Sequence, residues 1–177
     1  MEQNIFSIKI KPMEKGDIDE VIALEEKAYG EHHWSKDSFL SELSNDLASY
    51  FSAFDETGKL VAYCGCWKII EEAHVTTIAV LPEFRRKHIA ECLLKTIIDD
   101  CYKNMVKFIT LEVRVGNAPA ISLYEKYGFK SLGVRKGYYQ DNNEDALIMW
   151  TENIFYDKFK MLFDKNLREL DGKINIL

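Results

Sequence analysis

The stretch VTTIAVLPEFRRKHIAECLL, residues 75–94, decides the fold that the sequence predicts. Its first six residues are mostly apolar or β-branched, which favours a buried strand. Over residues 86–103, apolar side chains recur at three- and four-residue spacing, which predicts an amphipathic helix. A basic loop joins the two elements. The stretch therefore has the frame of an anion site, a strand that leads through a charged loop into a helix.

The residues alone allow two interpretations of the basic loop. The start of the helix presents unpaired backbone N–H groups and partial positive charge, to which Arg85, Arg86 and Lys87 add full charges. That combination predicts a phosphate site. The alternative is a solvated run of charge at an ordinary helix start. Position 88, where close approach to a phosphate favours glycine, is histidine.

The elements on either side follow from periodicity and turn residues. The prediction comprises a strand at residues 6–10, helices at 21–30 and 36–43, two antiparallel strands around the turn DETGK (55–59), a break at EEAH (71–74), a strand at 75–80, a helix at 86–103, a strand at 107–115, a helix at 118–127, strands at 129–139 and 144–151, and a tail helix from residue 155. This order predicts an α/β domain with a mixed, mostly antiparallel sheet, in which residues 75–114 form a parallel crossover.

Helix ends are predicted from capping residues. Asp17 and Glu20 have the spacing of a capping box, and Gly30 is expected to end the same helix. Trp34 and Phe39 flank the predicted start of the second helix with the spacing of a hydrophobic staple. In the tail, Asn166 interrupts an apolar stripe, and we expect the tail to pack on the domain rather than on a partner.

Composition excludes several classes of protein. The chain has 177 residues and a net charge of -6, which argues against general nucleic-acid binding. The alternating N-terminus has no apolar core of a signal peptide, and no uncharged stretch is long enough to span a membrane, so we expect a cytoplasmic protein. The cysteines show neither a disulfide framework nor zinc-ligand spacing and are predicted to be small core residues, namely Cys64, Cys66, Cys92 and Cys101. We expect no metal, including at the adjacent His32 and His33.

Two segments resemble the GNAT acetyltransferases. In that family a strand leads into Q/R-x-x-G-x-G/A and a helix. TIAVLPEFRRKHIAECLL is similar to this pattern, with Arg85 at its first position, Ala90 at its last and His88 in place of the first glycine. LEVRVGNAPAISLYEKYGF, residues 111–129, resembles the RimI type within the family at every specified position of L-E-V-R-x-x-N-x-x-A-x-x-L-Y-E-x-x-G-F. The segments HWS (33–35) and RKGYYQDNNEDALIM (135–149) also resemble that type.

The resemblance covers roughly residues 6–150 and implies a fold and an activity. The implied fold is the GNAT fold, with a central splayed pair of parallel strands and flanking helices. We expect residues 1–152 to form the acetyltransferase domain and residues 153–177 to form a C-terminal helical extension. The implied activity is acetyl transfer from acetyl-CoA to a protein N-terminus, the N-terminal alanine of a small-subunit ribosomal protein. The alternatives are a GNAT enzyme for a small-molecule amine or lysine, or a non-catalytic acetyl-CoA-binding regulator.

The resemblance also implies which residues bind the coenzyme. The strand before the loop offers backbone groups to the pantetheine arm, and the loop offers N–H groups to the pyrophosphate. The implied coenzyme-binding residues are Ile78, Ala79, Val80, Arg85, Arg86, Lys87, His88, Ile89, Ala90, Asn117 and Tyr124. If His88 has a positive φ, the substitution costs roughly 1–2 kcal/mol of strain. Its amide N–H survives in either case, so we expect a reshaped phosphate site rather than a lost one.

Two residues are candidates for proton transfer. Glu112 is a carboxylate in the middle of a strand, where burial without a partner is costly. It is either the general base, which the resemblance implies, or the partner of Arg114 on the same face. For Tyr124 the resemblance implies the general acid that protonates the coenzyme thiolate. The alternative is an aromatic core residue beside Tyr127.

The candidate acceptor-binding residues are aromatic or basic, namely Trp34, Arg135, Tyr138 and Tyr139. Trp34 has the alternative role of the staple, and the two tyrosines have that of ordinary strand aromatics. An N-terminal alanine has a small side chain, so recognition through backbone groups and a tight pocket is expected.

Overall fold

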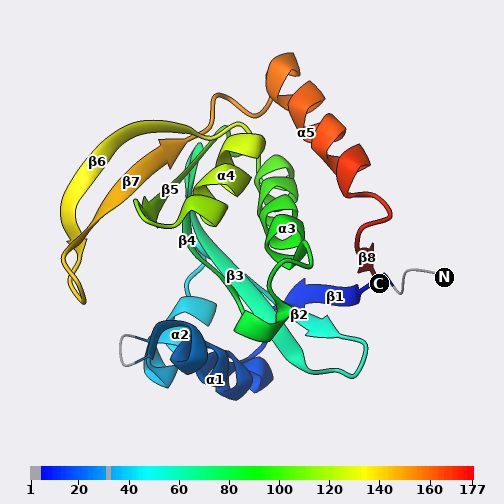
Figure 1. Cartoon of the computed structure of the whole chain (residues 1–177), viewed down its shortest axis with the longest axis vertical. Coiled ribbons are helices and arrows are strands. Elements are labelled where there is room, and N and C mark those ends of the chain that lie inside the picture. The colour runs from blue at the N-terminus through cyan, green and yellow to red at the C-terminus, as the bar shows by residue number, and fades with distance from the viewer. Residues whose placement is uncertain (1–4, 31–32) are drawn as a thin grey trace. The chain divides into compact units, whose positions relative to one another are not determined.

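The computed structural model describes residues 5–30 and 33–177. The chain forms two compact units. The first comprises the chain up to Trp67, Thr76–Asp99 and Leu170–Leu177, and the second comprises Lys68–Val75 and Asp100–Glu169. The helices and strands, labelled in Figure 1, are β1 (Ser7–Pro12), α1 (Ile18–Tyr29), α2 (Lys36–Leu43), β2 (Ala48–Asp55), β3 (Leu60–Ile69), β4 (Glu72–Val80), α3 (Ile89–Lys103), β5 (Phe108–Arg114), α4 (Ala118–Lys126), β6 (Lys130–Tyr139), β7 (Glu144–Trp150), α5 (Asp157–Leu170) and β8 (Asn175–Ile176).

The strands pair in the order β6-β7-β5-β4-β3-β2-β1-β8. β4 and β5 are parallel, with Glu72–Val75 opposite Phe108–Leu111. The pairs β1–β2, β2–β3, β5–β7 and β6–β7 are antiparallel. The predicted mixed sheet with a central parallel pair is therefore confirmed. The short β8, which pairs in parallel with β1, was not predicted.

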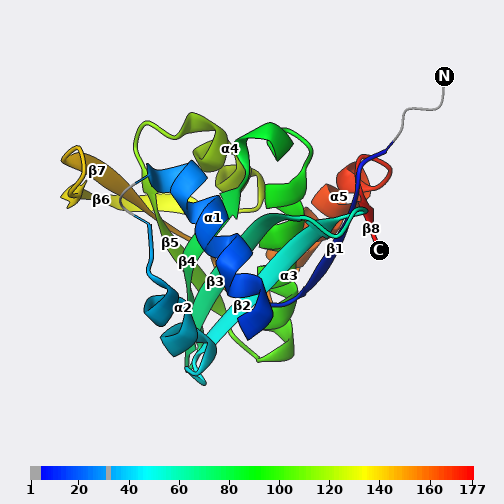
Figure 2. The same cartoon turned by 90° about the horizontal axis from the view of Figure 1, so that it is seen from below.

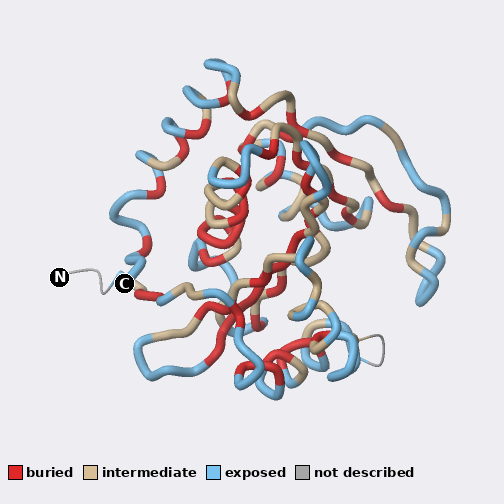
Figure 3. Tube along the Cα trace, turned by 180° about the vertical axis from the view of Figure 1, so that it is seen from behind, coloured by how far each residue is buried: buried red, intermediate tan, exposed pale blue. Residues whose placement is uncertain are grey.

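In the first unit, helices cover both faces of the strands. Tyr63 and Cys64 are neighbours on β3 and therefore point to opposite faces. The Tyr63 ring lies 5.7 Å from the ring of Phe39 in α2, on the face whose apolar cluster also includes α1. The Cys64 thiol approaches the Leu93 carbonyl of α3 on the other face. Figure 2 shows α1 lying across the strands, and Figure 3 shows the buried stretch of β3 in red.

All four cysteines are buried thiols, as the sequence predicts. Burial raises the pKa of the Cys92 thiol to about 12, so this group stays a neutral thiol near neutral pH.

In the second unit, α4 and α5 pack against each other. The rings of Tyr127 and Phe163 lie 6.1 Å apart. Asn166, which is 3% exposed, donates from Nδ2 to the Lys126 carbonyl at 2.7 Å. The amide thus binds a carbonyl in the last turn of α4, where helical carbonyls need partners from outside the helix. The tail packs on the chain as expected. Asn166, which interrupts the apolar stripe of α5, caps the C-terminal end of α4. The division between residues 1–152 and 153–177 stays a prediction.

The predicted capping box at the start of α1 is wrong. Asp17 Oδ2 accepts the Glu14 N–H at 3.0 Å and caps the short 3-10 turn Lys15–Asp17 instead. Glu20 Oε2 accepts the Leu60 N–H at 3.1 Å. Both carboxylates bind backbone donors outside α1, which spacing along the sequence does not reveal.

The other predicted helix ends in this region are confirmed. Gly30 follows α1 with a φ of 63°, a conformation that suits glycine. Ser35 Oγ accepts the Ser38 N–H at 3.2 Å at the start of α2. The rings of Trp34 and Phe39 lie 5.5 Å apart, which is the predicted staple.

Two predicted boundaries around β4 are wrong. The strand begins at Glu72, so the break is the shorter turn at Ile70 and Glu71, where Ile70 has a φ of 56°. α3 begins at Ile89 rather than at residue 86. Arg86 and His88 have φ values of 61° and 62°, and these left-handed conformations cannot continue into a right-handed helix.

Within residues 5–30 and 33–177, every helix is too short or too polar to cross a bilayer.

Candidate active site

The loop before α3 offers a run of backbone donors. Within residues 5–30 and 33–177, no hydrogen-bond acceptor is found for the N–H groups of Arg86 to Ala90. Three of these residues precede the helix and two form its first turn, where no earlier helical carbonyl is available. Successive free N–H groups at a helix start attract anions, because they add to the positive end of the helix dipole. The loop therefore fits a phosphate group.

The side chains of Arg85 to His88 are exposed, and three of them contact other parts of the unit. Arg85 donates from Nε to the Val80 carbonyl at 3.4 Å. Lys87 Nζ lies 4.6 Å from the centre of the Phe6 ring. His88 Nδ1 lies 3.0 Å from Oε2 of the buried Glu91. The charge beside the free N–H groups is therefore mainly positive, with Glu91 opposing it on the first turn of α3.

The φ of His88 answers the question that the sequence left open, since the residue is in the left-handed region. We expect His88→Gly to be more stable than His88→Ala by about 1 kcal/mol, because both remove the imidazole and only alanine keeps a Cβ in that region. At Lys87, which does not have a positive φ, the order of glycine and alanine should reverse. Urea unfolding of the four variants measures this. Equal stabilities of the two position-88 variants would contradict the strained conformation.

The strand residues Ile78, Ala79 and Val80 end β4 in the same unit as the loop. The Ala79 side chain is 4% exposed and belongs to the cluster that packs against α1 and α2. Ile78 and Val80 therefore face the other side of the sheet. Only backbone groups of Ala79 remain to bind a ligand.

Glu112 lies in the second unit at the centre of a charged cluster. Its side chain is 8% exposed. Oε2 lies 2.5 Å from Nε2 of His74 on β4, and Oε1 lies 3.5 Å from Nη1 of Arg135 on β6. In the parallel register, His74 is opposite Thr110. Its side chain therefore contacts Glu112, which lies two residues further along β5 than its register partner. The buried carboxylate is thus paired on both oxygens, which accounts for its burial.

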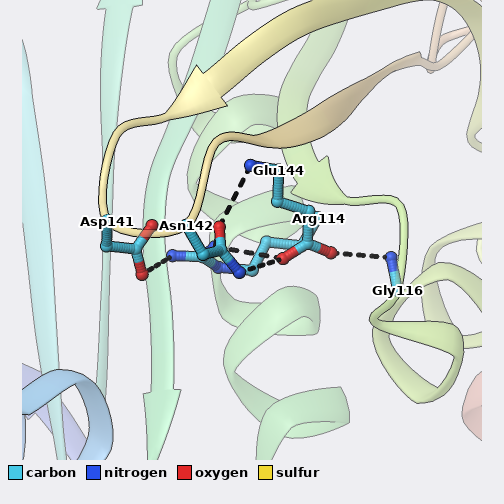
Figure 4. A network of polar contacts seen from close by, with 5 residues as sticks. All are labelled: Arg114, Gly116, Asp141, Asn142 and Glu144. Carbon is cyan, nitrogen blue, oxygen red and sulfur yellow. Dashed lines mark hydrogen bonds and ion pairs between the residues drawn. The ribbon is translucent and has the colours of Figure 1, made fainter.

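Arg114 is not the partner of Glu112, so that alternative is wrong. Arg114 donates from Nη2 to Asp141 at 2.8 Å and from Nη1 to Glu144 at 3.1 Å, as Figure 4 shows. Glu144 Oε1 also accepts the Gly116 N–H at 3.0 Å. The bond from Arg114 holds the pKa of Asp141 below its usual value. This network fixes the turn between β6 and β7 on the loop that precedes α4.

Tyr124 and Asn117 both belong to α4. Asn117 caps the helix, since its Oδ1 accepts the Ala120 N–H at 3.3 Å. Tyr124 is 9% exposed, and its ring lies 5.7 Å from that of Phe129. Tyr127 instead packs on α5, so the two tyrosines have different neighbours.

The candidate acceptor residues fall in both units. Trp34 lies in the first unit against α2. In the second unit, the Arg135 guanidinium lies 5.7 Å from the centre of the Tyr138 ring, and the rings of Tyr138 and Tyr139 meet edge to face at 5.1 Å. The Arg114 guanidinium stacks 3.9 Å from the centre of the Tyr139 ring. Arg135 therefore links the aromatic pair to Glu112.

His74 was missed, because the sequence analysis placed it in a break. The structure places His74 inside β4, which begins at Glu72. His32, considered with His33 as a metal site, lies outside the described residues.

Comparison with known proteins agrees with this arrangement. The model of the acetyltransferase (GNAT) family matches residues 18–129. A protein of Bacillus subtilis (strain 168) named putative [ribosomal protein bS18]-alanine N-acetyltransferase is 39% identical over 141 residues, which are 80% of this chain and 93% of that protein. The [ribosomal protein bS18]-alanine N-acetyltransferase of Escherichia coli (strain K12) is 33% identical over 142 residues, 79% of this chain and 94% of that protein.

A solved structure extends the comparison to the fold. The crystal structure of the ribosomal-protein-S18-alanine N-acetyltransferase from Escherichia coli matches with a TM-score of 0.75 and 32% identity, over 82% of this chain and 94% of that chain. The strand–loop–helix of β4 and α3, the mixed sheet and these similarities lead to one assignment. The chain belongs to the acetyltransferase (GNAT) family.

Proposed function

We propose that the protein transfers the acetyl group of acetyl-CoA to the N-terminal alanine of a small-subunit ribosomal protein, in the cytoplasm. The observation that carries the choice of acceptor is similarity over nearly the whole length of two relatives named for this activity. The segment with the most specific resemblance, residues 111–129, contains both candidates for proton transfer. No nucleic acid, membrane or metal is part of this proposal.

The coenzyme is held mainly by backbone groups in this proposal. The N–H groups of Arg86 to Ala90, which lack an acceptor among the described residues, bind the pyrophosphate, and the positive charges of the loop add to the attraction. The end of β4 offers its N–H and C=O groups to the pantetheine arm and to the acetyl carbonyl. Asn117 adds a contact to the same arm from the start of α4.

The acceptor amine must lose a proton before it can attack. An α-amino group has a pKa near ~8, and its charged form has no lone pair to donate. The buried Glu112 and the imidazole of His74, 2.5 Å apart, form a pair that can take up that proton directly or through a water. His74 is the more exposed member, with 36% of its side chain accessible against 8% for Glu112. This favours entry of the proton through the imidazole.

The remaining step is collapse of the tetrahedral intermediate. A bond forms between the amine nitrogen and the acetyl carbon, and the bond from that carbon to the coenzyme sulfur breaks. The sulfur leaves with the electron pair and takes a proton from the Tyr124 hydroxyl. The nitrogen loses its second proton to the resulting tyrosinate, directly or through water, which restores the hydroxyl. Donors at the end of β4 stabilise the oxyanion in the meantime. The products are an N-acetylated peptide and coenzyme A.

The experiment that tests this function compares acceptors at saturating acetyl-CoA. We expect kcat/KM to be highest for a peptide that begins with alanine, lower for the same peptide with a blocked N-terminus and an internal lysine, and lowest for a polyamine. A preference for the polyamine or lysine would favour the alternative specificity. Binding of acetyl-CoA without turnover on any amine would favour the regulator.

A further inference from the structure

Glu25 is a buried carboxylate in the first unit that the proposed reaction does not use. It lies on α1 and is 3% exposed. Burying a carboxylate is costly unless hydrogen bonds replace its water. Burial accordingly raises the pKa of Glu25 above its usual value. An apolar side chain of similar size would often be as stable at such a place, so stability alone is a weak reason for a carboxylate here.

The hydrogen bonds of Glu25 connect three separate parts of the unit. Oε2 accepts the backbone N–H of Trp34 at 3.3 Å, in the segment between α1 and α2. Oε1 accepts the hydroxyl of Tyr63 on β3. The Tyr63 oxygen in turn lies 3.3 Å from the hydroxyl of Thr77, which is the neighbour of Ile78 on β4. One carboxylate therefore joins the Trp34 backbone to the strand that carries the proposed oxyanion donors.

Aromatic packing leaves this network little freedom to rearrange. Tyr63 is 1% exposed, and its ring meets Phe39 edge to face at 5.7 Å. Phe39 also packs on the Trp34 ring at 5.5 Å. The side chain of Trp34 is thus held by Phe39, while its backbone is held by Glu25. Removing the carboxylate would free the backbone and leave the side-chain contact in place.

We propose that Glu25 is a positioning residue for the acceptor peptide. It holds Trp34 in its binding geometry, and through Tyr63 and Thr77 it keeps Trp34 in fixed relation to the end of β4. The inference rests on the proposed function, and on the prediction from the sequence that Trp34 is one of the acceptor-binding residues. A preformed segment lowers the cost of ordering the chain when the peptide binds, so the effect should fall on peptide binding rather than on coenzyme binding.

The test is steady-state kinetics with a peptide that begins with alanine, using Glu25→Ala, Glu25→Gln and Tyr63→Phe. We expect Glu25→Ala to raise the KM for the peptide about ten-fold or more, since it removes the buried hydrogen bonds that hold the Trp34 backbone and the Tyr63 hydroxyl. The KM for acetyl-CoA should not change. Glu25→Gln should restore most of the affinity, because the amide oxygen can accept the Trp34 N–H while its NH₂ group donates to the Tyr63 oxygen.

Glu56→Ala is the control, since Glu56 is an exposed glutamate of the same unit in the turn between β2 and β3. Its kinetics should equal those of the unaltered protein. Tyr63→Phe removes the hydroxyl and keeps the ring, so it gives a second measurement if Glu25→Ala does not fold. It should raise the peptide KM by less than Glu25→Ala does.

An unchanged peptide KM in Glu25→Ala would overturn the positioning role, as would a rise in both KM values or a Glu25→Gln variant no better than alanine. If Glu25→Ala does not fold, an unchanged peptide KM in Tyr63→Phe would overturn the role equally. These outcomes are separable from failure of the proposed function, since that failure appears in the unaltered protein as absence of turnover on the peptide. Absence of turnover there would overturn both.

Discussion

Glu112→Gln should lower kcat for acetyl transfer by about 100-fold or more, since general acid–base catalysis typically contributes about 10²–10⁴-fold. Glutamine keeps the shape of the side chain and removes its ability to take up a proton. The affinity for acetyl-CoA, which the proposal assigns mainly to backbone N–H groups before and in α3, should stay nearly unchanged. Single-turnover kinetics beside calorimetric titration with acetyl-CoA separates the two effects.

The pairing of Glu112 with His74 sharpens this prediction. If the two groups act as one proton acceptor, the double variant Glu112→Gln, His74→Gln should be little slower than Glu112→Gln alone. Glu125→Gln, an exposed carboxylate on α4, is the control and should leave turnover unchanged. Normal turnover in Glu112→Gln would remove this residue from the mechanism.

Tyr124→Phe should have the second largest effect, a fall in kcat of about 100-fold, because the leaving thiolate loses its proton donor. The ring contact with Phe129 does not need the hydroxyl, so the folded structure should be retained. A thioester analogue of the coenzyme with a more acidic thiol should recover part of the rate, since such a thiolate needs less help to leave.

Tyr127→Phe is the matched control for Tyr124→Phe. Tyr127 lies three residues further along the chain and is 1% exposed, and its ring packs on α5. This variant should keep its activity. A loss of rate in Tyr127→Phe equal to that in Tyr124→Phe would indicate a shared packing effect and would contradict the role of Tyr124 as general acid.

The strands and helices could be predicted largely from the sequence because the signals are local. Alternation in β1, three- and four-residue spacing in α3 and the Ser35 cap of α2 each lie within a few residues. The resemblance of residues 111–129 to one enzyme type then places Glu112 and Tyr124 on neighbouring elements. How these residues function stays a prediction.

The conformation of the loop before α3 could not be predicted, because two residues other than glycine adopt the left-handed conformation that usually favours glycine. Arg86 and His88 both have positive φ, and glycine is the usual sign of that conformation. Because the loop has no glycine, the periodic pattern predicted that the helix begins at residue 86, three residues before its observed start. Among the residues that the structure describes, the same conformation leaves the N–H groups of Arg86 to Ala90 without an acceptor, so the misplaced helix boundary and the proposed phosphate site have one physical cause.

Side-chain partners that depend on strand register were also beyond the sequence. The pairing of Glu112 with His74 depends on the register of β4 against β5, over a separation of 38 residues. Arg114 binds carboxylates 27 and 30 residues away, in the turn between β6 and β7 and at the start of β7. Spacing along one strand suggested Arg114 as the partner of Glu112, and tertiary structure supplied closer partners for both.

The central claim is transfer of acetyl from acetyl-CoA to an N-terminal alanine. The most direct test incubates the purified protein with acetyl-CoA and a small-subunit ribosomal protein that begins with alanine, followed by mass spectrometry of the intact acceptor and its fragments. The account predicts a gain of one acetyl group on the N-terminal fragment, and no gain when the N-terminus is already blocked. Acetyl groups on lysine side chains alone, or an acceptor of unchanged mass, would contradict it.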